Sequence, residues 1–315
     1  MTETGTSSRR RRPRWPRLLH AGSVTDPLVV VRSSTWNYNS IGLWSGDEVV
    51  LVDPGLAPAE LSMTAARAMG AGRMDAPRRI AHLVLTHAHH DHVRGAHAFP
   101  GARVWMPTIA ARKPDAARAR ILAAGDRLSE RLAGSPAPLA WPTVDEEFDE
   151  TARVTFGDDA TLELWFLPGH SNCTSVVWVP SSRTLLSADY LVSPGVPFCR
   201  HEALLFEQAL ERLLALTDSL PIERVVPAHG DLLVGTEAVR AAIELDLTTF
   251  RAMRAAAERR LAAGEAVDAQ SAEAVAALVA AASEARGFEA GLLAAQDEDN
   301  AARILREVAA SGSAA

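Results

Sequence analysis

The segment from Thr86 to Gly95, THAHHDHVRG, constrains this chain more than any other part of its sequence. It places four histidines and one aspartate within the six positions from 87 to 92. Neighbouring imidazoles repel one another when protonated, and each neutral ring needs a partner for its N–H group and for its lone pair. A metal ion removes both difficulties because it takes the lone pairs and favours the neutral rings. The chain is therefore expected to fold so that this segment forms a metal site.

The run IAHLVLTH, which ends at His87, predicts a buried strand that leads directly into the histidines. Alternate residues of an extended segment point the same way, so His87 and His89 can reach one ion together. If a helix begins next, Asp91 and His92 fall on a new face and can hold a second ion. His90 is expected to point away from both ions. Three imidazoles and one carboxylate suit zinc, with iron and manganese as alternatives.

Short β-rich runs and helical segments alternate along the rest of the chain. Strands are expected within residues 27–34, 39–46, 48–55, 80–87, 102–107, 160–170, 174–180, 183–191 and 222–230. Helices are expected over residues 58–69, 108–133, 202–217, 236–262, 271–286 and 298–310. A Pro-rich and then acidic connection is expected over 134–150. This order predicts an α/β protein in which two packed sheets are flanked by helices.

Charge and composition suggest three parts: a disordered basic tail over 1–22, a domain over 23–235 that contains the histidine segment, and a helical extension over 236–315. Six arginines lie within residues 9–17, but the net charge of −7 argues against a general nucleic-acid binder. No apolar run is long enough to cross a membrane. The chain has only two cysteines, which give no disulfide framework, so a cytoplasmic protein is expected.

The H-x-H-x-D-H pattern resembles the signature of the metallo-β-lactamase fold hydrolases. Four further landmarks of that family occur here in order: Asp53 in VLVDPG, His170 in LPGHS, Asp189 in LLSADYL and His229 in VVPAHGD. The resemblance covers most of residues 28–235 and implies an αββα sandwich, which this chain would extend with additional C-terminal helices. Arg94 stands where many members have glycine, a departure that leaves the ligand positions untouched.

The resemblance also implies which side chains bind metal. Seven side chains would bind two divalent ions. The first ion would be bound by His87, His89 and His170, and the second by Asp91, His92 and His229. Asp189 would bridge the two ions. Two neighbouring cations lower the pKa of a shared water, so hydroxide forms near neutral pH. Asp91 would orient that hydroxide or shuttle its proton, and Asp53 would hold the histidine loop through hydrogen bonds.

The implied activity is that of a dinuclear metal-dependent hydrolase whose metal-bridging hydroxide attacks a small ester, thioester or lactone. In this family, thioesterases keep all seven ligands, as do many lactonases and phosphodiesterases, and the thioesterase and lactonase types are favoured here. The chain has a single lysine and no tyrosine after Tyr190, which argues against glutathione and leaves coenzyme A or a carrier protein as the thiol. Four aromatic residues are candidates for the substrate wall: Trp36, Trp141, Phe148 and Tyr190.

Three other functions stay open. The arginine arm fits a phosphodiesterase that processes nucleic acid, although the acidic body weighs against it. A persulfide dioxygenase with one iron has the same histidine motif. A non-catalytic protein that binds metal and a partner has the same fold, but an intact ligand set argues for turnover. Assembly as a homo-oligomer is also left open.

Overall fold

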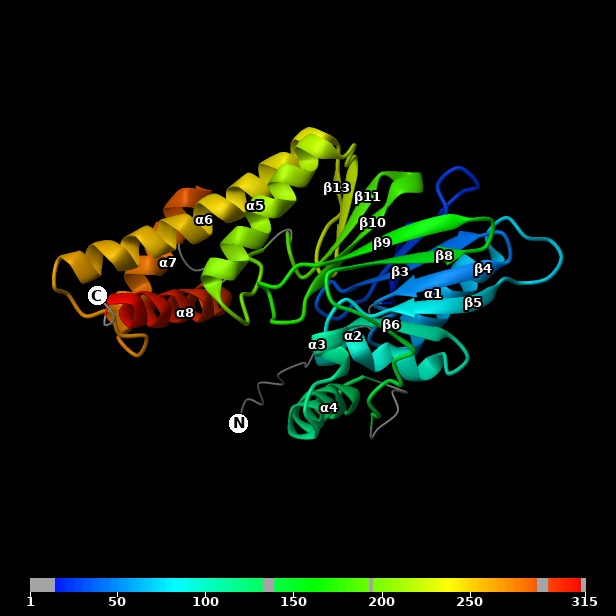
Figure 1. Cartoon of the computed structure of the whole chain (residues 1–315), viewed down its shortest axis with the longest axis horizontal. Helices are drawn as coiled ribbons and strands as arrows, with labels where there is room; N and C mark the ends of the chain where they lie inside the picture. The colour runs from blue at the N-terminus through cyan, green and yellow to red at the C-terminus, as the bar shows by residue number, and fades with distance from the viewer. Residues whose placement is uncertain (1–14, 133–138, 193–194, 288–293, 313–315) are drawn as a thin grey trace, which may run out of the picture.

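The structure is a computed structural model that describes residues 15–132, 139–192, 195–287 and 294–312. Two sheets lie face to face at its centre, and helices cover the outer face of each (Figure 1). Among the described residues, no helix combines the length and apolar content that a membrane crossing requires. The arrangement confirms the predicted αββα sandwich with additional C-terminal helices.

The first sheet has seven strands, ordered β1 to β7 across the sheet as in the sequence. Their bounds are β1 Arg17–His20, β2 Leu28–Arg32, β3 Asn39–Ser45, β4 Glu48–Val52, β5 Arg79–Val84, β6 Arg103–Pro107 and β7 Glu146–Phe148. Strands β1 to β4 are antiparallel neighbours, whereas β4 to β7 run parallel. The carboxyl ends of the parallel strands therefore meet at one edge of the sheet.

The second sheet has six strands in the order β13-β12-β11-β10-β9-β8. Their bounds are β8 Thr151–Phe156, β9 Ala160–Phe166, β10 Ser175–Val179, β11 Thr184–Ala188, β12 Arg224–Pro227 and β13 Leu233–Val234. Only β11 and β12 are parallel neighbours. Because these two strands are parallel, both end at the same edge, where Asp189 after β11 lies 4.0 Å from His87 after β5.

Eight α-helices complete the described structure. They are α1 Pro58–Gly70, α2 His90–Val93, α3 Thr108–Ala111, α4 Asp115–Ser129, α5 Ala203–Ser219, α6 Thr236–Ala262, α7 Ala272–Arg286 and α8 Ala294–Gly312. Helices α1 to α4 lie on the side of the first sheet. Helices α5 to α8 gather on the side of the second sheet, where the long α6 runs beyond the strands (Figure 1).

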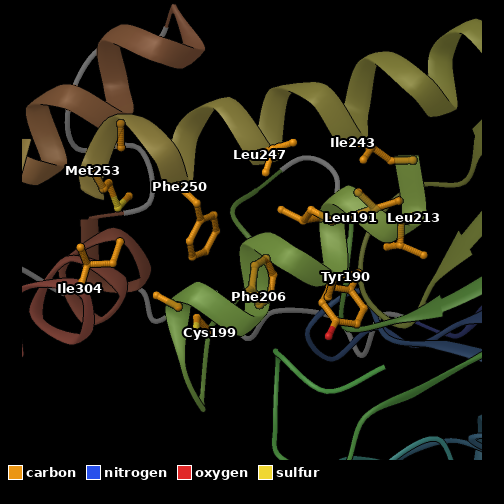
Figure 2. Close-up of a cluster of buried hydrophobic side chains, with 14 of the residues drawn as sticks. Tyr190, Leu191, Cys199, Phe206, Leu213, Ile243, Leu247, Phe250, Met253 and Ile304 are labelled. Carbon is orange, nitrogen blue, oxygen red and sulfur yellow. The ribbon is translucent and has the colours of Figure 1, made fainter. Parts of the chain in front are cut away.

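Alternation along single strands separates the hydrophobic layers. In β4, Val50 and Val52 face the second sheet, whereas Val49 and Leu51 face α1 and its neighbours. A third cluster joins the second sheet to α5, α6, α7 and α8 (Figure 2), with Phe206 stacked on Phe250 at 4.5 Å between ring centroids. The C-terminal helices therefore share one continuous core with α5 of the central fold.

Three local predictions were wrong. Residues 17–20, placed in the basic tail, form β1 at the edge of the first sheet; residues 1–14 lie outside the described residues. The helix expected over 108–133 is divided into α3 and α4 because Pro114 cannot continue the first helix and instead begins the second. The connection over 134–150 contains β7, whose Glu146 and Glu147 pair with β6, so cross-strand pairing overrides their weak strand propensity.

Candidate metal centre

Every predicted ligand follows the carboxyl end of a strand. His87 and His89 lie in the extended segment after β5, and α2 begins at His90, so Asp91 and His92 turn onto a new face. The other three predicted ligands, His170, Asp189 and His229, come directly after β9, β11 and β12. Because these strands end at one edge of the sandwich, segments far apart in the sequence meet there.

The structure brings the first predicted set together. His89 Nδ1 lies 2.9 Å from His87 Nε2 and 3.0 Å from His170 Nε2. Asp189 Oδ2 lies 3.1 Å from His170 Nε2. One ligand atom from each of these four residues falls within 4.8 Å of all the others. That spacing suits three imidazoles and one carboxylate around a single cation.

The second set lies directly beside the first. His229 Nε2 is 3.3 Å from Asp91 Oδ2, and these two residues form a group with His92. The other oxygen of Asp189, Oδ1, lies 3.1 Å from His92 Nε2. Asp189 therefore directs one carboxylate oxygen at each group, so it could bind a cation in either of them.

Two buried polar atoms of this centre lack hydrogen-bond partners, which bears on whether metal ions fit it. His92 Nε2 and Asp189 Oδ1 are buried, and neither makes a hydrogen bond, although they lie close together. Buried polar atoms without a partner are costly, and the close ring nitrogens of the first group cannot all act as donors to one another. Divalent cations would accept all of these lone pairs, so the residues fit a metal centre.

Asp53 holds the centre from outside. Its carboxylate accepts hydrogen bonds from the Thr86 backbone N–H at 2.9 Å and from the Thr86 hydroxyl at 2.7 Å. His92 Nδ1 lies 2.9 Å from the same carboxylate and donates to it, which leaves His92 Nε2 for the metal. The Thr86 hydroxyl in turn accepts from His87 Nδ1 at 3.0 Å. The structure thus places Asp53 in the supporting role that the sequence suggested.

Two backbone carbonyls orient the ligands that come from the second sheet. His229 Nδ1 donates to the Trp36 carbonyl at 3.0 Å, and His170 Nδ1 donates to the Phe198 carbonyl. A carbonyl can only accept, so both rings direct Nε2 at the metal groups. Trp36 and Asn37 adopt left-handed φ angles of 55° and 51°, which are strained for non-glycine residues and recur at functional sites.

Electrostatics divide the imidazoles into two classes. Burial lowers the pKa of His89 to about 3, and the nearby His170 adds to the effect. Burial also acts to lower the pKa of His92, but the carboxylates of Asp189 and Asp53 outweigh it and raise that pKa well above its ordinary value. The first group therefore favours neutral rings, whereas the second is rich in negative charge that a cation can neutralise.

A cavity of about 600 Å³ opens onto both groups. Its lining residues come from the loop after β2, the histidine motif, the segments after β9, β11 and β12, and α8: Trp36, Asn37, His90, Asp91, His170, Asp189, Val192, Gly195, Val196, Phe198, Arg200, His229, Gly230 and Gln296. His90 belongs to neither metal group, in agreement with the sequence, yet it lines this cavity with its ring centroid 5.8 Å from that of Trp36. The metal groups are therefore accessible to a small molecule.

Of the four aromatic residues predicted to form the substrate wall, the structure places Trp36 alone at this cavity. Phe148 is buried between the two sheets, and Trp141 lines a separate cavity beside Phe99. Tyr190 is fully buried, where its hydroxyl donates to the Leu167 carbonyl and accepts from the His170 backbone N–H. Phe148 and Tyr190 fill the interior, where aromatic residues supply much of the apolar area, whereas Trp141 is partly buried away from the metal groups.

Sequence reasoning missed several supporting residues. Tyr38 is fully buried, with its ring centroid 5.4 Å from that of His92 and 5.2 Å from that of His229. Arg94, noted only as a departure from glycine, donates to the Gly125 carbonyl and the Ser129 hydroxyl and so ties the histidine motif to α4. That departure was the one signal in the sequence; nothing near Tyr38 indicated its place.

Comparison with known proteins agrees with this geometry. The sequence profile of the Metallo-beta-lactamase superfamily matches residues 35–229, which include all seven clustered side chains. No curated protein matches the sequence.

Solved structures share the fold at low sequence identity. A stereoselective inverting sec-alkylsulfatase from Pseudomonas sp. is 15% identical with a TM-score of 0.60, over 89% of this chain and 49% of that chain. A beta-lactamase domain protein from Burkholderia ambifaria is 16% identical with a TM-score of 0.59, over 92% and 89% of the two chains. A metallo-beta-lactamase from Pontibacter korlensis is 20% identical with a TM-score of 0.51, over 73% and 99%. This chain thus spans about half the length of the alkylsulfatase.

Proposed function

The chain belongs to the metallo-beta-lactamase superfamily of metal-dependent hydrolases, and from that premise we propose that it uses two divalent ions, zinc in the first instance, to hydrolyse a small ester, thioester or lactone. The observation that carries this proposal is the position of Asp189. Its two oxygens face two separate groups of ligands, at 3.1 Å from His170 Nε2 and 3.1 Å from His92 Nε2. A carboxylate placed in this way could bind one ion of each group through a separate oxygen.

Bound divalent ions supply an activated water and a Lewis acid for the substrate oxygen. Asp91 lines the cavity and lies 3.3 Å from His229, so its carboxylate can orient a water and accept a proton there. Burial acts to raise the pKa of Asp91, but His92 and His229 outweigh it and hold that pKa well below its ordinary value. Asp91 is consequently ionised at neutral pH, as a group that orients a nucleophile must be.

The shape of the cavity supports a small substrate. Trp36 and Phe198 give apolar surface on its wall, and a volume of about 600 Å³ suits an acyl group or a lactone ring rather than a macromolecule. If the substrate is a thioester, the carrier is proposed to be coenzyme A or the arm of a carrier protein, with its bulk outside the cavity. Among the described residues of this wall, the histidines are accompanied by a single arginine, which offers little basic surface to a nucleic-acid substrate.

The test combines metal analysis with a substrate screen. The purified protein should contain close to two ions per chain and should turn over at least one ester, acyl-coenzyme A thioester or lactone. Asp189→Asn should reduce that turnover by at least about 10²-fold because the amide lacks the charge shared by both ions. A content fixed at one ion after incubation with zinc, manganese or iron would favour the persulfide dioxygenase. Two bound ions without turnover of any substrate class would favour the non-catalytic alternative.

One observation favours a second candidate, hydrolysis of an anionic ester such as a sulfate monoester. Arg200 is the one lysine or arginine among the described residues that line the cavity. Its guanidinium lies 4.4 Å from the Phe198 ring centroid and 3.4 Å from Asp299, and the side chain remains 47% exposed. A guanidinium held in this way can bind a sulfate or a carboxylate through paired hydrogen bonds. The resemblance in fold to an alkylsulfatase is consistent with this candidate.

Arg200→Met separates the two candidates. If the substrate is anionic, KM should rise by about 10-fold or more for the anionic ester, while a neutral ester of similar size keeps its KM. Arg212→Met, on the exposed surface of α5, is the matched control. Equal effects on the two esters would exclude a role for Arg200 in anion recognition.

A further inference from the structure

We propose that Asn300, on α8, is a positioning residue for the metal ligand His170, an inference that rests on the proposed dinuclear centre. Helix α8 lies far outside residues 35–229, the part of the chain that matches the superfamily. The C-terminal helices would then be a working part of the metal centre rather than an appendage to it.

The Asn300 side chain binds the backbone on both sides of Phe198. Its Oδ1 accepts a hydrogen bond from the Cys199 N–H at 2.9 Å, and its Nδ2 donates to the Pro197 carbonyl at 3.1 Å. The side chain is fully buried, so no water competes for either bond. A single amide thereby fixes the orientation of the two peptide units that flank Phe198.

The same short segment holds His170 at two points. The Phe198 carbonyl accepts from His170 Nδ1, and the Arg200 N–H donates to the His170 carbonyl at 2.7 Å. The ring and the backbone of this ligand are therefore both fixed from one side. His170 Nε2 is left facing the first metal group, 3.0 Å from His89 Nδ1.

The segment that holds His170 has no regular secondary structure of its own. Residues 195–202 belong to no helix or strand, so they lack the ladder bonds that would fix a carbonyl in a sheet. Arg303, one turn further along α8, adds a second anchor by donating to the Cys199 carbonyl at 2.9 Å and to the His201 carbonyl. Figure 2 shows Ile304 of α8 and Cys199 at the same hydrophobic cluster. The orientation of the Phe198 carbonyl is consequently set by α8.

A purely structural role for α8 predicts a different result from a positioning role. Val308 is also buried on α8, two turns beyond Asn300, and belongs to the same core cluster. Val308→Ala weakens the packing of α8 but leaves the polar contacts to 197–199 in place. It is therefore the matched control for Asn300→Ala, which removes those contacts.

The experiment measures zinc affinity by competition with a chromophoric chelator, in the full-length protein and both variants. We expect two equivalents in the parent protein. Asn300→Ala should weaken one of them by about 10- to 100-fold, the usual effect of losing a group that orients a ligand. Val308→Ala should leave both affinities unchanged even where its melting temperature falls as far. The absorption spectrum of the cobalt-loaded Asn300→Ala protein should change as well, because the geometry at His170 changes.

The outcomes separate the two proposals. If the parent binds two zinc ions and Asn300→Ala binds both with unchanged affinity, the positioning role is overturned and the dinuclear proposal stands. The same conclusion follows if Val308→Ala weakens zinc binding as much as Asn300→Ala does. One equivalent in the parent overturns the dinuclear proposal, and the effect of Asn300→Ala on that one affinity then decides the positioning role. No zinc binding by the folded parent overturns both. If Asn300→Ala fails to fold, Asn300→Asp replaces it: this variant keeps the acceptor for Cys199, loses the donor to Pro197 and should give an intermediate loss.

Discussion

Replacement of Asp53 by asparagine is the most informative perturbation outside the ligands themselves. The Asp53 carboxylate accepts three hydrogen bonds, two from Thr86 and one from His92, and the residue is only 2% exposed. Its φ of 45° lies in the left-handed region, which asparagine tolerates as readily as aspartate. The substitution therefore changes the charge and one acceptor atom without straining the backbone.

The expected loss follows from those contacts. Hydrogen bonds to a charged group contribute about 1.5 to 3 kcal/mol each, and the amide retains one acceptor oxygen of two. At least one of the three bonds is lost, so the free energy of unfolding should fall by about 2 to 3 kcal/mol in the metal-free protein. The amide NH₂ can also donate to His92 Nδ1, which would move the ring proton to Nε2 and occupy the metal-binding position. Affinity for the second ion should then fall by about 10- to 100-fold.

Denaturant unfolding of the metal-free protein and a zinc competition titration measure the two effects separately. Asp159→Asn is the matched control, because Asp159 also has a left-handed φ, of 62°, but is exposed on the surface. The control should change neither quantity. Parent-like stability together with parent-like affinity for two ions in Asp53→Asn would refute the supporting role assigned to this carboxylate.

Three further outcomes are expected. Chelation of the metal should abolish turnover, and added zinc should restore it. Asp91→Asn should lower kcat by at least about 10²-fold at equal metal occupancy, and near-normal turnover by this variant would contradict the role of the Asp91 carboxylate. Burial raises the pKa of Asp246 to about 7 from an ordinary value of 3.8, so its contribution to stability is greatest below that ordinary value and is lost as the pH rises through 7. The free energy of unfolding of the parent, relative to Asp246→Asn, should accordingly fall between about pH 4 and pH 7, and a flat difference in denaturant titrations would exclude this. Deletion of residues 1–14 should leave turnover unchanged, whereas deletion of 1–20 removes β1 and should lower the melting temperature in a thermal scan.

The sequence alone indicated the candidate ligands of the histidine motif, because their spacing is a short-range feature, whereas His170, Asp189 and His229 were expected from the family resemblance. Alternate residues of an extended segment point the same way, so His87 and His89 had to share one side of the chain. The change to a helix at His90 then turned Asp91 and His92 onto another face. In β4, by contrast, Val49 to Val52 are all apolar, so only the packing of the layers decided which of them face the second sheet. The same local rules failed at Pro114 and at Glu146, where a helix break and a pairing with β6 decided the outcome.

What only the tertiary structure decided is which groups surround those ligands. The carbonyls of Trp36 and Phe198 orient His229 and His170, and a carbonyl is present at every residue, so no sequence pattern can single these two out. Asn300 follows Cys199 by about a hundred residues, and its role depends on how α8 packs against the core. The sequence determines which side chains are available as ligands, because the metal-binding chemistry of histidine and aspartate is a property of the side chain. Their orientation depends on long-range contacts between backbone groups, which exist only once the sheets and the C-terminal helices have packed together.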